Sequence, residues 1–164
     1  MDATPTIRPA LAADDDAIWA ILEPTFRAGE TYPIPRDITR ADALRYWRAD
    51  GNDVFVAEQD GAIVGSYYLR ANNRGGGAHV ANGGYVVASG ATGRGVARAM
   101  CMDSLTRAGA RGFAAMQFNF VIASNERAVR LWQSCGFAIV GRLPQAFQHP
   151  RLGYVDAYVM VRTL

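Results

Sequence analysis

The sequence predicts an α+β fold with one central mixed, mostly antiparallel sheet of about six to seven strands, flanked by four helices. Two observations predict it. Apolar residues recur every second position in some stretches and every third or fourth position in others, and glycine, proline or aspartate turns separate these stretches. In chain order, the pattern indicates a strand, two helices, three strands, a helix, a strand, a helix and two strands.

The first fifty residues predict a strand and two helices joined by an irregular loop. A short strand at residues 6–9 precedes three aspartates at residues 14–16, whose negative charge favours a helix start. We expect Pro24 to kink or shorten this first helix. Residues 27–37 contain a glycine and two prolines and predict an irregular segment, after which Thr39 caps the second helix.

From residue 53 the apolar pattern changes to a period of two. Residues 54–58 and 63–69 flank Asp60-Gly61, a strong signal for a tight hairpin. The remaining elements are expected as a strand at 79–88, a helix at 94–110, a strand at 113–122, a helix at 125–136 and two closing strands at 137–143 and 154–161, the last two separated by a loop at 144–153.

Composition and charge exclude several classes of protein. The chain has 164 residues, half of them hydrophobic, which predicts one domain over residues 1–164 with a packed core. All 17 basic residues are arginine and the net charge is +2, with no basic run, so no nucleic-acid partner is implied. No signal peptide and no membrane-spanning apolar run is visible, so we expect a cytoplasmic protein without a membrane partner.

Cysteine and histidine are too few for an obvious metal centre. Cys101 and Cys135 both fall in helical patterns and form no C-x-x-C pair, which predicts buried free thiols. Only His79 and His149 could join them as zinc ligands. We therefore expect no metal.

Residues 85–100 run from an apolar strand through small residues into a helix. The first turn of a helix leaves four N–H groups unpaired and positively polarised, and glycines let a phosphate approach them. Arg94 and Arg98 add positive charge. A P-loop is excluded because the chain has no lysine, and a dinucleotide fingerprint is weak because Gly93 and Gly95 lack the third glycine.

The segment Thr92-Gly93-Arg94-Gly95-Val96-Ala97 resembles the coenzyme A pyrophosphate loop of the GCN5-related N-acetyltransferases. That loop has arginine or glutamine, two residues, glycine, one residue, then glycine or alanine; here Gly95 and Ala97 match, and Thr92 replaces the first residue. Residues 124–137 resemble the same family's Asn-x-x-Ala-x-x-Leu-Tyr-x-x-x-Gly-Phe signature, with Trp132 in place of tyrosine. The resemblance extends from about residue 54 to the end and favours a bacterial branch acting on small molecules, including amino acids and their analogues.

This resemblance implies a GNAT-like fold and transfer of the acetyl group of acetyl-CoA to the amine of a small molecule by direct attack. In the family, the strand before the loop leaves backbone groups free to hold the pantetheine arm and polarise the acetyl carbonyl, a role that falls here to Val86 and Val87. Family habit also implies a homodimer. The expected cofactor-binding residues are Val86, Val87, Thr92, Gly93, Arg94, Gly95, Val96, Ala97, Arg98, Asn125 and Trp132.

Three residues are candidates for the catalytic step. His79 has a suitable intrinsic pKa for a base, although a lone histidine at a strand start is more often a surface residue. Glu30 could attract the ammonium group or relay its proton; the alternative is a solvated loop charge. Asn119 could hydrogen-bond the substrate; the alternative is an amide that satisfies loop backbone.

The sequence indicates less clearly which residues bind the acceptor and which group protonates the leaving thiolate. Tyr32, Tyr85 and Asn82 are expected to bind the substrate, with packing or turn formation as the alternative. Trp132 cannot supply a proton, so the thiolate leaves unassisted or with help from water or another group. Asp156, on the last strand, is left open between an exposed position and one that faces the substrate.

Three other functions stay open at this point. An acyl-CoA-binding sensor on the same fold would fit the missing acidic groups, and a protein N-terminal acetyltransferase would share the donor site. A nucleotide-binding α/β protein is the unrelated alternative. Each differs from a small-molecule N-acetyltransferase in what it binds or turns over.

Overall fold

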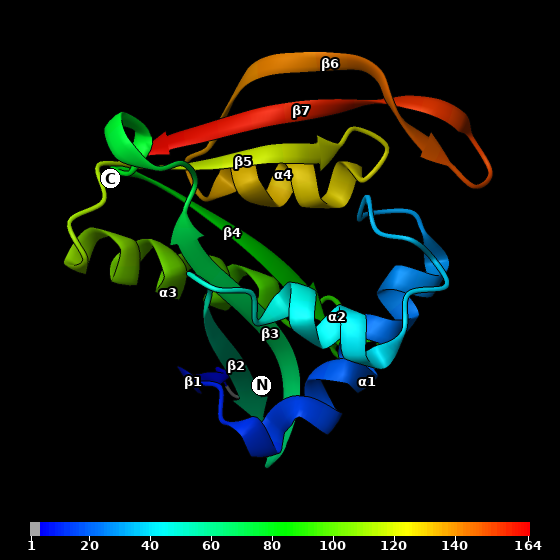
Figure 1. Ribbon diagram of the computed structural model, residues 1–164, viewed down its shortest axis with the longest axis vertical. Helices are drawn as coiled ribbons and strands as arrows, with labels where there is room; N and C mark the ends of the chain where they lie inside the picture. Colours follow the sequence, from blue (N-terminus) through cyan, green and yellow to red (C-terminus); the bar gives the residue numbers. More distant parts are fainter. Residues whose placement is uncertain (1–3) are drawn as a thin grey trace.

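A computed structural model describes residues 4–164, which form a seven-stranded sheet in the order β1-β2-β3-β4-β5-β7-β6 (Figure 1). All neighbouring strands are antiparallel except β4 and β5. The strands are β1 (Thr6–Pro9), β2 (Asp53–Gln59), β3 (Ala62–Ala71), β4 (Val80–Val87), β5 (Ala115–Ile122), β6 (Ala138–His149) and β7 (Gly153–Thr163); the α-helices are α1 (Asp15–Ala28), α2 (Arg40–Trp47), α3 (Val96–Ala110) and α4 (Glu126–Ser134). The predicted fold class and element order are confirmed.

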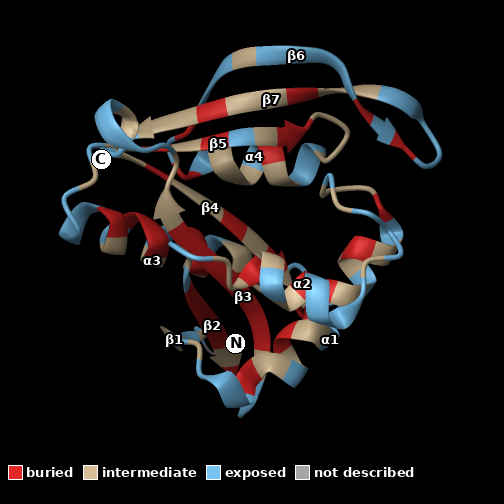
Figure 2. Ribbon diagram, viewed as in Figure 1, coloured by how far each residue is buried: buried red, intermediate tan, exposed pale blue. Residues whose placement is uncertain are grey.

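The helices cover both faces of the sheet, because side chains alternate along each strand. On β2, Val56 packs with Leu22 of α1 and Trp47 of α2 in one core cluster. The neighbouring residue Ala57 belongs to a second cluster with Met100 of α3, which also contains residues of α4. Figure 2 shows these buried positions concentrated on the central strands and on the inner sides of the helices.

Two local predictions are confirmed. Thr39 caps α2, since its Oγ1 accepts a hydrogen bond from the Asp42 N–H at 3.1 Å. Asp60 and Gly61 form the two-residue turn between β2 and β3, both with positive φ, as the favoured hairpin turn requires.

Of the two effects expected of Pro24, a kink or a shorter α1, the second is wrong. The helix runs past Pro24 to Ala28 and ends where Gly29 adopts a left-handed φ of 65°. Proline costs the helix one hydrogen bond. Leu22 and Phe26, which flank Pro24, are both buried against the sheet and hold the helix in place.

The expectation of a loop at residues 144–153 is also wrong, because β6 extends to His149. The β6–β7 register shifts near Pro144, and Gln145 has a φ of 49°. The Gln145 N–H donates to Asp156 Oδ1 at 2.9 Å, which gives Asp156 a structural role in this bulge. Proline is tolerated there because β6 is the edge strand and a bulge needs no ladder hydrogen bond.

Both cysteines are buried free thiols, as the sequence predicts. Among the helices of residues 4–164, none combines the length and the apolar character needed to cross a membrane.

The feature that positions the site is a split between β4 and β5. These strands pair only where Val80 lies opposite Ala115 and Ala81 opposite Met116, and then they spread apart (Figure 1). From Asn82 onward, β4 therefore has a strand partner on its β3 side alone.

The packing under α2 generates a stability prediction. Ser66 is fully buried; its Oγ accepts from Trp47 Nε1 at 2.9 Å and donates to the Phe55 carbonyl at 2.8 Å. Ser66→Ala leaves the buried indole N–H without its acceptor, so we expect the free energy of unfolding to fall by about 1–3 kcal/mol. Ser89→Ala, at an exposed serine, is the matched control for urea denaturation. An equal effect of both variants would contradict this reading.

Candidate functional site

The split between β4 and β5 opens into a cavity of about 550 Å³. On the α1–α2 side of the sheet its walls include Tyr32, Tyr46 and Tyr68. On the opposite side they include Thr92 and Ala97 at the start of α3, and residues of α4. Since these helices lie on opposite faces, the cavity passes through the sheet.

The register of β4 determines which backbone groups face this cavity. The Ala88 N–H bonds to Val64 O at 2.8 Å, so Val87 and Gly65 form a non-hydrogen-bonded pair. The N–H and C=O groups of Val87 consequently point away from β3 and toward the cavity. Tyr85 and Gly83 also form non-hydrogen-bonded pairs with β3, so their N–H and C=O groups point toward the cavity as well.

This register corrects the expectation for Val86. Val86 lies opposite Ser66 in a hydrogen-bonded pair, so β3 already uses its N–H and C=O groups. Its side chain lines the cavity, but its backbone is not available to a ligand there. Val87 alone of the two expected residues has a backbone that faces the cavity.

The Tyr32 hydroxyl reaches across the cavity to the backbone of Tyr85. It accepts from the Tyr85 N–H at 2.9 Å and donates to the Tyr85 C=O at 3.0 Å. Burial raises the pKa of Tyr32 well above its usual value, which keeps the phenol protonated. The Tyr85 side chain points elsewhere: its hydroxyl lies 2.6 Å from Ser104 Oγ in the core. Tyr85 therefore meets the cavity through its backbone.

The glycine-rich loop presents open backbone at the start of α3. Gly93 and Gly95 adopt left-handed φ values of 86° and 80°, and Gly95 is the N-cap residue. No side chain of residues 4–164 caps this helix, so the N–H groups of its first turn remain available. A β-carbon placed on Gly95 would meet nothing within 4 Å, so the space beside the loop is open.

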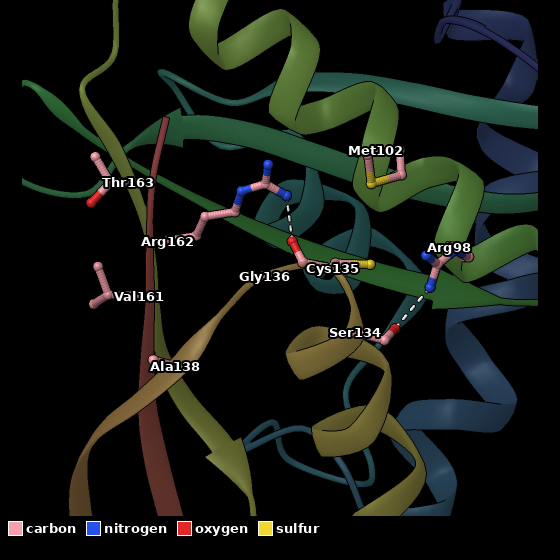
Figure 3. A pocket seen from close by; sticks show the side chains of 9 residues that line it. All are labelled: Arg98, Met102, Ser134, Cys135, Gly136, Ala138, Val161, Arg162 and Thr163. Carbon is pink, nitrogen blue, oxygen red and sulfur yellow. Dashed lines mark hydrogen bonds between the residues drawn. The ribbon is translucent and has the colours of Figure 1, made fainter.

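The side chains of Arg94 and Arg98 turn away from the cavity. Arg94 pairs with Asp60 on the β2–β3 turn at 3.2 Å. Arg98 donates to Ser134 Oγ at 2.8 Å and lines a separate hollow, where Arg162 donates to the Cys135 carbonyl (Figure 3). Neither guanidinium supports the expected contact with a cofactor, whereas the backbone of both residues stays in the loop.

Arg127, which is not among the predicted site residues, lines the cavity from the first turn of α4. One of its terminal nitrogens lies 3.3 Å from the place a β-carbon on Gly93 would occupy. It therefore supplies the positive charge beside the loop that the sequence assigns to other arginines. The sequence signal that could have indicated this role is the position of Arg127 two residues after Asn125, within the motif at residues 124–137.

Two expected cofactor residues of α4 do line the cavity. Asn125 caps the helix through Oδ1, which accepts from the Ala128 N–H at 3.3 Å, and its Nδ2 group can donate to a ligand. The Trp132 ring lies 5.0 Å from the rings of both Tyr85 and Phe118. Its place at the cavity wall is thus fixed by aromatic packing.

Two amides also line the cavity. Asn82 Oδ1 accepts from the Gly83 N–H at 2.7 Å. Asn119 lies in a bulge of β5 between Phe118 and Val121, which directs this part of the strand to the cavity. Its Nδ2 donates to Asn72 Oδ1 at 2.6 Å.

The other two catalytic candidates are outside the cavity wall. His79 is exposed just before β4, at the end where β4 and β5 are still paired, so the geometry does not support a role as base. Glu30 pairs with Arg151 at 2.9 Å, which joins the α1–α2 loop to the β6–β7 turn. Glu30 precedes Thr31, which does line the cavity.

Comparison with known proteins identifies the family. Residues 16–137 match the acetyltransferase (GNAT) family model. The chain is 29% identical over 148 residues to N-acetyltransferase aca1 of Schizosaccharomyces pombe, covering 80% of this chain and 71% of that protein. A GCN5-related N-acetyltransferase from Kribbella flavida is 42% identical, with 98% of each chain covered and a TM-score of 0.93. A ribosomal-protein-alanine N-acetyltransferase from Brucella melitensis is 26% identical, covering 97% of this chain and 99% of that one, with a TM-score of 0.83. The chain therefore belongs to the acetyltransferase (GNAT) family.

Proposed function

We propose that this enzyme transfers the acetyl group of acetyl-CoA to the amine of a small molecule by direct attack. One observation carries the proposal: the cavity passes through the sheet, from open backbone amides at the start of α3 to an aromatic pocket under the α1–α2 loop. Such a passage lets two substrates enter from opposite faces and meet at β4. Holding both reactants in place supplies much of the rate of such a transfer.

On the donor side, the first-turn N–H groups of α3 and the Arg127 guanidinium would hold the pyrophosphate. The pantetheine arm would lie along β4, beside the unpaired backbone of Val87, with Asn125 and Trp132 on its other side. A strand advances about 3.3 Å per residue, so an extended arm reaches Tyr85 two residues further in. We therefore place the thioester beside Tyr85.

On the acceptor side, the pocket is aromatic and uncharged. Tyr32, Tyr46, Tyr68 and Phe120 form much of its wall, and two amides, Asn82 and Asn119, supply polar groups. Within residues 4–164, no carboxylate lines the cavity. Such surroundings disfavour a charged ammonium and favour a small amine with an apolar body that enters in its neutral form.

The reaction then needs little side-chain chemistry. The amine nitrogen attacks the thioester carbon, the C–N bond forms, and a β4 backbone N–H stabilises the oxyanion. The C–S bond breaks, and the thiolate takes up a proton from water, since its pKa is near 8.5 and Trp132 has none to give. The amine proton passes to water at the pocket mouth, where Asn119 orients the acceptor. Glu30, next to the cavity residue Thr31, has its charge partly balanced by Arg151.

Two wider predictions remain predictions: a cytoplasmic location and a homodimer. The exposed edge strand β6 supports a contact between two copies, because Ile139, Val140 and Leu143 on it are exposed apolar residues (Figure 2).

A thiol-release assay with acetyl-CoA tests the proposed function. The panel holds small apolar amines, amino acids, polyamines and an alanine-initiated peptide, the last because the Brucella melitensis relative is named for ribosomal-protein alanine. We expect turnover with a small apolar amine and the weakest turnover with polyamines. Tight acetyl-CoA binding without turnover on any acceptor would instead favour a sensor. Displacement of CoA by ATP would favour a nucleotide-binding protein.

Gly95→Asp tests the placement of the pyrophosphate. The new carboxylate would stand beside the expected phosphates, and aspartate strains a backbone with φ of 80°. We expect acetyl-CoA affinity to fall by at least about tenfold in calorimetry. Gly51→Asp is the matched control, since Gly51 also has a left-handed φ and open surroundings but lies in the α2–β2 connection. Unchanged affinity in Gly95→Asp would contradict the placement.

Trp132→Phe tests whether the indole only packs. Phenylalanine keeps an aromatic ring against Tyr85 and Phe118 and removes no titratable proton. We expect kcat within about tenfold of the wild type, with most of the change in the KM for acetyl-CoA. Loss of all turnover in a folded variant, as judged by circular dichroism, would show that the indole does more than pack.

A further inference from the structure

The contact between Tyr32 and Tyr85 has the form of a missing strand pairing. A residue in the middle of a sheet needs an acceptor for its N–H and a donor for its C=O. One hydroxyl serves as both for Tyr85, at 2.9 Å and 3.0 Å. Tyr32 therefore takes the place that β5 would occupy if the two strands stayed paired.

Tyr32 is held in this position from the α1–α2 side. Its ring makes edge contacts with Phe26 at 5.6 Å and Trp47 at 6.3 Å between ring centroids. Both of these rings belong to the core under α1 and α2. A displacement of the phenol from β4 would therefore change the packing of the acceptor pocket.

Along the edge of β4 that faces the cavity, some backbone groups have hydrogen-bond partners and others have no strand partner. The side chain of Asn82 takes the Gly83 N–H at 2.7 Å, and Tyr32 takes both groups of Tyr85. Val87, next to the glycine-rich loop, faces the cavity without a strand partner. An arm that enters from the loop thus meets open backbone first and the Tyr32 hydroxyl second.

We propose that Tyr32 is a positioning residue that holds the Tyr85 N–H until the acetyl donor binds, and that the thioester carbonyl then displaces it. This inference rests on the proposed function, which brings the thioester to Tyr85. One N–H makes one strong hydrogen bond, so carbonyl and phenol compete for it. Binding of the donor thereby releases the phenol into the acceptor pocket, which prepares that pocket only after the donor is in place.

The competition predicts a difference between two ligands. Acetyl-CoA carries the carbonyl that must displace Tyr32, whereas CoA ends in a thiol without one. In Tyr32→Phe the Tyr85 N–H is already free, so we expect acetyl-CoA to bind about three- to tenfold more tightly than to the wild type. CoA should bind both proteins with equal affinity.

Calorimetry with acetyl-CoA and with CoA, on the wild type and on Tyr32→Phe, tests this. Tyr67→Phe is the matched control, because it also removes a hydrogen-bonded phenol, whose hydroxyl donates to Asp103 Oδ2 at 2.6 Å and not to the β4 backbone; Tyr67 does not line the cavity. We expect its affinity for acetyl-CoA to stay within about twofold of the wild type.

A second measurement needs no variant. The ¹⁵N-labelled Tyr85 amide should shift in the NMR spectrum of the wild type when acetyl-CoA is added, and far less with CoA. Two results would overturn this inference and leave the proposed function intact. One is a Tyr85 amide that responds equally to both ligands, and the other is an equal gain in affinity for both ligands in Tyr32→Phe. A wild type that binds neither ligand overturns the proposed function, and the inference with it.

Discussion

The structure depends on one constraint: a strand in the middle of a sheet must find partners for its backbone groups even where its neighbour departs. β4 and β5 pair at only two positions, and the groups of β4 beyond them face a cavity. Leaving such groups buried without partners costs about 1–3 kcal/mol each. The side chains of Asn82 and Tyr32 meet part of this need, whereas the backbone of Val87 faces the cavity without a strand partner on that side.

Other features of the site follow from this separation. The bulge in β5 bends that strand at Asn119 and Phe120, and the two halves of the sheet leave room between them for the cavity. The loop between β4 and α3 then stands at one mouth of the cavity with its amides open. The split sheet and the N-terminus of α3 therefore place open backbone N–H groups at one mouth of the cavity.

Most of the fold could be predicted because its signals are local. The Thr39 cap and the Asp60-Gly61 turn depend on neighbours within a few residues, and the strand periods on burial of one face. The extent of β6 depends on Asp156, eleven residues from Gln145, whose N–H it accepts. The site divides in the same way. Gly93 and Gly95 can be recognised from the local sequence. The pairing with β3 decides that the backbone of Val87, and not that of Val86, faces the cavity. The partners of Arg98, Arg127 and Tyr32 are likewise residues far away in the sequence.

The ion pair between Glu30 and Arg151 spans the gap between the α1–α2 loop and the β6–β7 turn. The Arg151 side chain is 73% exposed, so the pair contributes at most about 1 kcal/mol and weakens as salt rises. The contribution of this ion pair to stability is thus comparable to thermal energy. A contact of this strength lets the α1–α2 loop and the β6–β7 turn move apart without any rearrangement of the core, and more readily as ionic strength rises.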